Sequence, residues 1–83
     1  MSIPKEGVSL EYAIAQLRGN NPHKYWAVDP NSEFYLYASK PVLDPILQIW
    51  KPSDPVDFPI RCGRIDMSEY GTSGWKMLSG EFI

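Results

Sequence analysis

The chain has 83 residues, a formal net charge of −2 and one cysteine, Cys62. This length accommodates a single small domain over residues 1–83 but not two domains. One cysteine excludes a disulfide within the chain, and the absence of a signal-type apolar run fits a reducing, intracellular setting. No window approaches the roughly 20 consecutive apolar residues that a membrane span requires, so we expect no membrane partner.

The charged residues argue against nucleic acid as a direct ligand. The eight lysines and arginines are scattered along the chain, whereas a nucleic-acid interface needs a basic face. The net charge is also too close to zero for a protein that imitates DNA. Three tryptophans and five tyrosines are the unusual feature of so short a chain. Because these residue types are enriched in protein interfaces, we expect association through aromatic surface.

The N-terminal region contains one predicted helix. Residues 1–8 have the features of a leader strand or an ordered arm. Ser9 is a suitable N-cap, and Gly19 is a natural helix terminator. Between them, one helical face carries an apolar stripe made of Leu10, Ala13, Ile14 and Leu17. These features together predict a helix over residues 9–18.

Two aromatic runs, residues 25–28 and 34–37, predict a β-hairpin. The sequence Asp29-Pro30-Asn31-Ser32 predicts a type I turn between them, capped by the Asp29 side chain. Alternation along the strands gives two apolar faces, so either both faces are covered or one is an open aromatic platform. We expect one face to combine Tyr25 and Ala27 with Phe34, Leu36 and Ala38, and the other to combine Trp26 and Val28 with Tyr35 and Tyr37.

The remaining residues predict short strands separated by proline-rich loops. We expect a connection at 40–45, a third strand at 46–50, a loop at 51–57 and a fourth strand at 58–65. A turn or a short helical turn at 66–74 and a short fifth strand or turn at 75–79 follow. Because proline is tolerated only at the start or edge of a strand, Pro59 favours a fourth strand that begins at Ile60. The predicted fold is α+β, with one N-terminal helix packed on a small, mainly antiparallel sheet of four to five short strands.

No pattern of a catalytic or metal site is evident. His23 is the only histidine, and zinc sites need three or four ligands, so a surface loop histidine is expected. Cys62 lies beside Arg61 and Arg64, which would lower a thiol pKa, although a strand cysteine is more often a small buried apolar residue. Most acidic residues adjoin turn-forming residues, and the glycines form no phosphate-binding loop. We therefore expect a non-enzyme that uses no cofactor and no metal.

Three features remain as candidates for binding. One is the aromatic face of the hairpin, one is a pair of arginines suited to a phosphate or an acidic partner, and one is a tryptophan beside the loop at 51–57. Each feature also has a structural alternative. The rings of the hairpin face could be packed with their hydroxyl groups in water, the two arginines could be solvated, and the tryptophan could belong to the core. The candidate binding residues are Trp26, Tyr35, Tyr37, Trp50, Arg61 and Arg64.

The last two-thirds of the chain resembles a group of small phage and prophage accessory proteins. The resemblance lies in Lys-Tyr-Trp-Ala-Val-Asp at 24–29, Phe-Tyr-Leu-Tyr at 34–37, Lys-Pro at 40–41, Trp50, Gly-Arg-Ile at 63–65 and Trp-Lys-Met-Leu-Ser at 75–79. It implies a bacteriophage origin and an accessory role in the host cytoplasm, but no activity or site. The helix at 11–17 and Trp75 are also similar to phage anti-Thoeris nucleotide-sequestering proteins, although the chain lacks their basic run leading to Trp and glycine.

Three functions are compatible with these observations. The first is binding of a host protein, with inhibition of a host defence or metabolic protein. The second is sequestration of a nucleotide between subunits through Arg61, Arg64 and stacked aromatic rings. The third is a minor structural role in the virion. A homo-oligomer is compatible with all three, because a small core gains stability from association.

Overall fold

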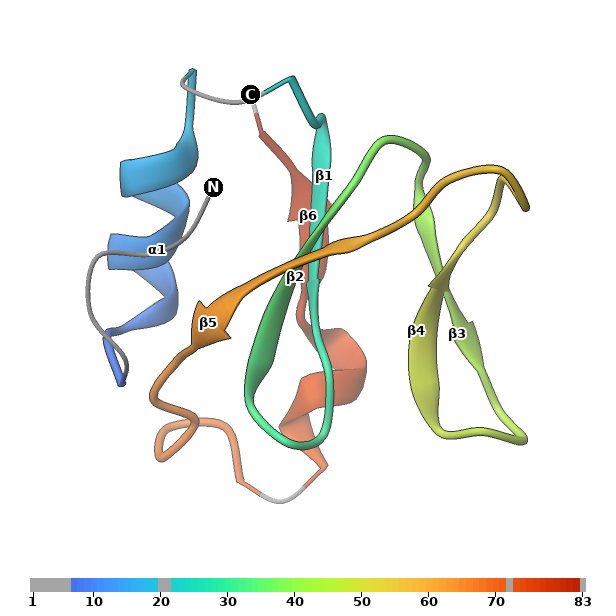
Figure 1. The fold of residues 1–83 in the computed structure, drawn as a ribbon. Coiled ribbons are helices and arrows are strands. Elements are labelled where there is room, and N and C mark those ends of the chain that lie inside the picture. Colours follow the sequence, from blue (N-terminus) through green and yellow to red (C-terminus); the bar gives the residue numbers. More distant parts are fainter. Residues whose placement is uncertain (1–6, 20–21, 72, 83) are drawn as a thin grey trace.

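A computed structural model describes residues 7–19, 22–71 and 73–82. One helix, α1 (Leu10–Leu17), lies on one side of a four-stranded sheet, and a two-stranded hairpin lies on the other side (Figure 1). This arrangement confirms the predicted α+β fold. The strands are β1 (Tyr25–Val28), β2 (Glu33–Tyr37), β3 (Pro41–Asp44), β4 (Ile49–Pro52), β5 (Ile60–Arg64) and β6 (Ser79–Glu81), and a short 3₁₀ helix, η1 (Gly74–Met77), precedes β6.

The helix forms where its capping residues and apolar stripe predict it. The Ser9 side chain accepts a hydrogen bond from the Tyr12 backbone N–H at 3.2 Å, which satisfies one of the donors left free at a helix start. Leu10, Ala13 and Leu17 are buried against the sheet. After the helix, Gly19 has a φ of 77°, a left-handed conformation that glycine adopts without strain.

The β1–β2 hairpin forms as predicted, with a three-residue loop. The Ser32 N–H donates to the Asp29 carbonyl at 2.9 Å, and the Asp29 N–H donates to the Glu33 carbonyl at 3.0 Å. Ser32 has a φ of 71°, as expected for the bulge residue that follows a type I turn. The Asn31 side chain, rather than that of Asp29, accepts from a backbone N–H of this turn, that of Glu33 at 3.3 Å.

The predicted grouping of residues on the hairpin faces is wrong. Trp26 lies opposite Leu36 and Val28 lies opposite Phe34, and directly opposed residues share a face. One face therefore carries Trp26, Val28, Phe34 and Leu36, and the other carries Tyr25, Ala27, Tyr35 and Tyr37. The cause is the loop length. With an odd number of loop residues, even-numbered positions of β1 pair with even-numbered positions of β2. An even number of loop residues would have paired even-numbered with odd-numbered positions, as predicted.

Both faces of the hairpin are covered. On the α1 side, Trp26 and Phe34 stack with ring centroids 5.8 Å apart and join the core beneath the helix. On the other side, Ala27 and Tyr37 are each 1% exposed, and the β3–β4 hairpin lies on this side of the sheet (Figure 1). Of the two arrangements that the sequence allows, the structure therefore has the one in which both faces are covered.

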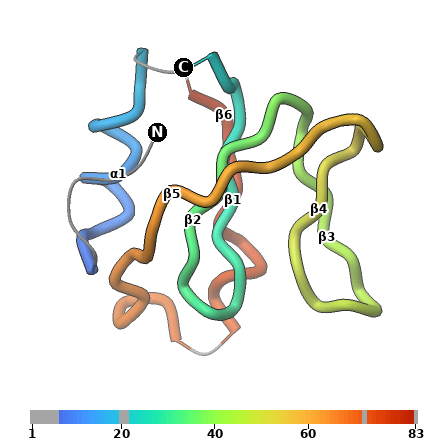
Figure 2. The backbone as a smooth tube through the Cα atoms, viewed as in Figure 1, coloured from blue at the N-terminus to red at the C-terminus, as the bar shows by residue number. Residues whose placement is uncertain are grey.

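The sheet order is β5-β2-β1-β6, with every neighbouring pair antiparallel. After β2 the chain leaves this sheet, forms the β3–β4 hairpin and returns as β5 beside β2 (Figure 2). The strand β5 begins at Ile60, directly after Pro59, as predicted.

The predicted position of the third strand is wrong. The residues predicted as the third strand, 46–50, contain the turn between β3 and β4, and the predicted connection at 40–45 contains β3. Residues 75–79, predicted as a short strand or a turn, lie mainly in the 3₁₀ turn η1, and the last strand, β6, follows at Ser79–Glu81. Prolines stand at the first position of β3 and the last position of β4, which a two-stranded sheet tolerates because both of its strands are edges.

We expect Gly80→Ala to lower the free energy of unfolding by about 1–3 kcal/mol, as overpacking of a filled core does. A β-carbon at Gly80 would lie 2.8 Å from Cζ2 of Trp26, whose ring is held by stacking on Phe34. Urea denaturation followed by tryptophan fluorescence measures the change. Ser79→Ala, on the opposite face of β6, is the control and should stay within about 0.5 kcal/mol of the wild type. An unchanged midpoint for Gly80→Ala would contradict the close contact.

Candidate functional site

Two of the predicted binding residues lie in the interior. Trp26 is 9% exposed and Tyr37 is 1% exposed. Burial raises the pKa of the Tyr37 hydroxyl, because the ionised phenolate is disfavoured away from water. Neither residue presents its ring to the surface, so of the two arrangements considered, the open aromatic platform is absent at these two positions.

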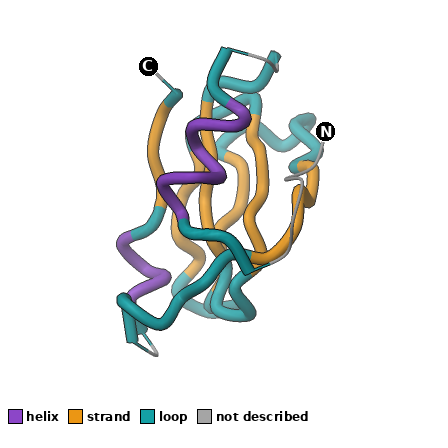
Figure 3. The backbone as a smooth tube through the Cα atoms, turned by 90° about the vertical axis from the view of Figure 1, so that its left-hand side faces the viewer, coloured by secondary structure: helices purple, strands orange, loops and turns teal. Residues whose placement is uncertain are grey.

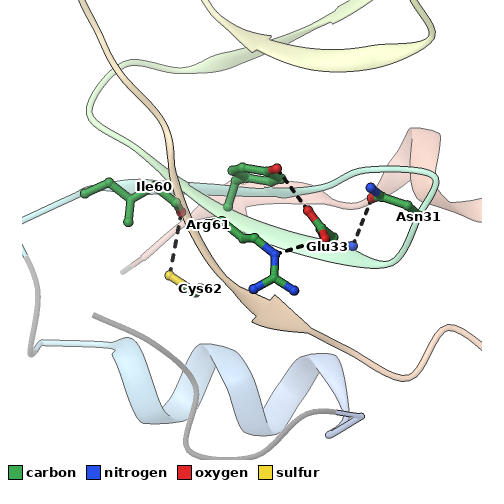
Figure 4. A network of polar contacts seen from close by, with 6 residues as sticks. Asn31, Glu33, Ile60, Arg61 and Cys62 are labelled. Atoms are coloured by element: carbon green, nitrogen blue, oxygen red, sulfur yellow. Dashed lines mark hydrogen bonds and ion pairs between the residues drawn. The ribbon is translucent and has the colours of Figure 1, made fainter.

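The side chains of Tyr35 and Arg61 meet at one carboxylate. The Tyr35 hydroxyl donates to Glu33 Oε2 at 3.0 Å, and Arg61 Nε lies 2.9 Å from Glu33 Oε1 (Figure 4). The hydrogen bond from Arg61, followed by that from Tyr35, lowers the pKa of Glu33. Burial and the hydrogen bond to Glu33 raise the pKa of Tyr35. Tyr35 is therefore a partly buried member of a polar network on the strand surface.

A β-bulge brings Arg61 and Arg64 to the same face of β5. Arg61 pairs with Tyr35 and Arg64 pairs with Glu33, two residues apart on β2, and the register shifts between these pairs. Residues three apart in a regular strand would lie on opposite faces. Both arginines are exposed, and Glu33 offsets part of their charge, since both of them favour its ionised form.

Cys62, the extra residue of this bulge, is 3% exposed. Its thiol contacts the Ile60 carbonyl at 3.7 Å (Figure 4). Burial raises the pKa of the thiol in spite of the neighbouring Arg61 charge. A buried thiol with a raised pKa is a poor nucleophile. Of the two roles considered for Cys62, the structure therefore confirms that of a small buried apolar residue. Among the described residues, no group of three or more His, Cys, Asp or Glu side chains is arranged to hold a metal ion.

Trp50 joins β4 to the β1–β2 turn and to η1 through two hydrogen bonds. Its backbone N–H donates to Asp29 Oδ1 at 2.9 Å, and its indole Nε1–H donates to the Trp75 carbonyl at 3.1 Å. Partial burial raises the pKa of Asp29, and the bond from Trp50 opposes this effect. Trp50 is half-buried and Trp75 is 4% exposed. Trp50 is therefore a fixed attachment point of the β3–β4 hairpin.

Exposed apolar side chains concentrate in residues 41–60, which we call the arm. The arm consists of β3, β4 and the loop that leads to the first residue of β5. Ile46 is 88% exposed, Leu47 is 65% exposed and Phe58 is 81% exposed. The other exposed large apolar residues of the arm are Val42, Leu43, Val56 and Ile60. Among the described residues outside the arm, only Tyr12 and Met77 are of this kind.

The turn at the end of the β3–β4 hairpin is held by one aspartate. Asp44 Oδ1 accepts from the backbone N–H of Ile46 at 2.9 Å and of Leu47 at 3.0 Å. The Gln48 N–H donates to the Asp44 carbonyl at 2.9 Å. The bonds from Leu47 and Ile46 lower the pKa of Asp44, so the carboxylate is ionised at neutral pH. The backbone of the turn is thus fixed while its two apolar side chains point into water.

A second aspartate fixes the loop that carries Phe58. Asp57 Oδ2 accepts from the Ser39 N–H at 2.9 Å, the Ser39 hydroxyl at 2.8 Å and the Ala38 N–H at 3.1 Å. Partial burial disfavours the charge on Asp57, but the bonds from Ser39 and Ala38 outweigh it and lower the pKa. Asp57 is therefore a structural residue that ties the loop to the end of β2.

The sequence contained a signal for the arm that the prediction did not use. The dipeptide Asp44-Pro45 repeats the Asp29-Pro30 signal that predicted the first hairpin turn. Asp54-Pro55 is a third case, and Asp54 accepts from the Val56 N–H at 3.0 Å. Each of the three Asp-Pro pairs lies in or beside a turn of the structure.

In comparisons with known proteins, no protein-family model, no curated protein and no solved structure matches this chain. The resemblance to phage accessory proteins therefore stays a prediction. Within the described ranges, no helix has the length and apolar character to cross a bilayer. The geometry of the arm is the main structural basis for a functional proposal.

We expect Asp29→Ala to lower the free energy of unfolding by about 1–2 kcal/mol, because the Trp50 N–H loses its acceptor. Asp29→Asn is the matched variant: its amide oxygen still accepts this bond, and it removes a charge that partial burial disfavours. Its unfolding free energy should therefore stay closer to that of the wild type. Urea denaturation at neutral pH measures both variants. Equal losses for the two substitutions would contradict the role of this hydrogen bond.

Proposed function

We propose that this chain is a non-catalytic binding protein that docks onto another protein through the arm. Ile46 and Leu47 are the central contacts, and Phe58 is a further anchor on the neighbouring loop. The proposal rests on one observation: large apolar side chains are exposed on a turn whose backbone is fixed by Asp44.

The energetics favour docking at this turn. Burying a Leu or Ile side chain that was exposed is worth about 1.5–3 kcal/mol, and Ile46 and Leu47 are 88% and 65% exposed. Association normally costs free energy because interface loops lose freedom. The hydrogen bonds that Asp44 accepts order the turn before any partner arrives, which reduces this cost. Adjacent exposed apolar side chains on an ordered loop are typical of an interaction site.

The chemistry of the partner follows from the arm. A surface that receives Ile46, Leu47 and Phe58 must itself be apolar, and a hydrophobic groove or patch on a protein fits this requirement. The resemblance to phage accessory proteins supports a host protein in the infected bacterial cytoplasm as the partner. In that setting, docking of the arm would inhibit a host defence or metabolic protein by covering its surface.

We expect Ile46→Ser and Leu47→Ser to abolish capture of the partner without changing the fold, since both side chains are largely exposed. Met77→Ser is the matched control, because Met77 is 86% exposed and lies outside the arm. Tagged full-length chains, incubated with bacterial lysate in mild salt, would be compared by quantitative mass spectrometry. A host protein retained by the wild type and by Met77→Ser, but lost with both arm variants, is the expected result.

Asp44→Ala is a second variant in the same experiment. It keeps the apolar side chains but removes the acceptor that orders the turn, so partner binding should weaken by about tenfold rather than vanish. Equal retention of every host protein by the wild type and the two arm variants would contradict docking through the arm. Near-ultraviolet circular dichroism confirms that each variant is folded.

The paired arginines support a second candidate function, sequestration of a nucleotide by an oligomer of this chain. The bulge places Arg61 and Arg64 on one face beside Tyr35, and guanidinium groups suit bidentate contacts with phosphate. This candidate is weaker because Arg61 already pairs with Glu33.

A thermal-shift experiment separates the two functions. A tightly bound nucleotide should raise the melting temperature by mass action, and Arg64→Ala should remove the shift. Arg18→Ala, an exposed arginine after α1, should leave the shift unchanged. No shift with any nucleotide of a broad panel would contradict sequestration.

A further inference from the structure

The strand β6 ends the sheet with an open edge. Val28 donates its N–H to the Leu78 carbonyl at 2.9 Å, and the Phe82 N–H donates to the Lys24 carbonyl at 2.8 Å. Since backbone groups alternate in direction along a strand, Gly80 also points its N–H and carbonyl toward β1. Ser79 and Glu81 therefore point theirs away from the sheet. No described segment lies beyond β6 on that side (Figure 3).

The opposite edge of the sheet is protected. Gly7 donates its N–H to the Arg64 carbonyl at 3.0 Å, and the Asp66 N–H donates to the Val8 carbonyl at 2.7 Å. Pro59, just before β5, has no N–H to offer, and the bulge at Cys62 breaks the regular ladder. These features block strand addition at β5. The backbone groups of β6 have no comparable cover among the described residues.

We propose that a second copy of this chain pairs with β6 in antiparallel orientation, about a two-fold axis through Gly80. In this register Ser79 lies opposite the partner's Glu81, and Glu81 lies opposite Ser79 of the partner subunit. These are the two positions whose N–H and carbonyl groups face outward, so the four outward N–H groups of the two strands all find acceptors. The glycines meet at the axis, where no side chain obstructs the approach.

Charge complementarity supports a second copy as the occupant. A pocket of about 330 Å³ lies beside β6, lined by Tyr25, Lys40, Pro41, Ser79, Gly80 and Glu81. The side chains of Ser79 and Glu81 share a face with Tyr25. The partner's Glu81, opposite Ser79, would extend over this same face toward the pocket and the ammonium group of Lys40. Each copy thus completes the pocket of the other with a carboxylate, and like charges are not directly opposed.

The interface is small, because it consists of two three-residue strands and their flanking side chains. Interfaces of this size give weak, concentration-dependent association. None of the exposed apolar residues of the arm lines the pocket, so the dimer does not depend on docking through the arm. The dimer would carry two arms, and two arms on one particle bind a partner more tightly than one arm does.

Sedimentation velocity of the full chain, over roughly micromolar to millimolar concentrations, tests the proposal. The wild type should form dimers as concentration rises, and the amide protons of Ser79 and Glu81 should exchange more slowly with it. Glu81→Pro removes one outward N–H per copy and should weaken the dimer by about tenfold to a hundredfold. Glu81→Lys should weaken it as well, because a lysine would then face Lys40.

The double variant Lys40→Glu with Glu81→Lys restores opposite charges and should recover the dimer. Glu69→Lys is the control, since it makes the same charge change at an exposed position away from β6 and should dimerise like the wild type. A wild-type chain that stays monomeric at all concentrations would overturn the proposal. A dimer that is insensitive to Glu81→Pro and Glu81→Lys would also overturn it, because the contact would then lie elsewhere.

Discussion

Both faces of the β1–β2 hairpin carry large apolar side chains, and water is excluded from both only if two separate elements cover them. The helix α1 covers the face of Trp26 and Phe34. The other face, which includes Ala27 and Tyr37, lies on the side of the β3–β4 hairpin. A chain of this length has few residues to spare, so the arm is a necessary layer of the fold as well as an exposed surface.

The arm meets both requirements because its two sides have different chemistry. Trp50 attaches it inward through Asp29 and the Trp75 carbonyl. Outward, Ile46 and Leu47 extend into water from a turn that Asp44 orders. Aspartates recur at these points because a carboxylate accepts several backbone N–H bonds at once. They therefore serve as structural acceptors in this fold.

Much of the fold follows from local rules in the sequence. The helix was predictable because the Ser9 cap, the apolar stripe and Gly19 all agree, and the first hairpin was predictable from its Asp-Pro turn. The face grouping was not, because a single loop residue changes the parity of strand pairing. The apolar run at 46–50 was interpreted as a strand because hydrophobic periodicity does not distinguish a strand from an ordered apolar turn.

The candidate site was less predictable than the fold. Composition drew attention to aromatic residues, but it does not reveal which rings are buried. Trp26 is buried on the face that α1 covers, and Tyr37 is buried on the face toward the β3–β4 hairpin. Both arrangements depend on how distant parts of the chain pack together. The meeting of Arg61 and Arg64 on one face depends on a bulge at Cys62, for which the strand pattern carried no signal. The exposed residues Ile46 and Leu47 were predicted in a strand, whereas they lie in the turn between β3 and β4.

The central claim is that the arm is an ordered element with its apolar side chains in water. Nuclear magnetic resonance of the full chain tests it most directly, by combining amide hydrogen exchange with a soluble paramagnetic probe. The account predicts that the amide protons of Ile46, Leu47 and Trp50 exchange more slowly than in an unstructured peptide, while the methyl groups of Ile46 and Leu47 are strongly relaxed by the probe. Amide exchange at the unstructured rate, or methyl groups shielded from the probe, would contradict it.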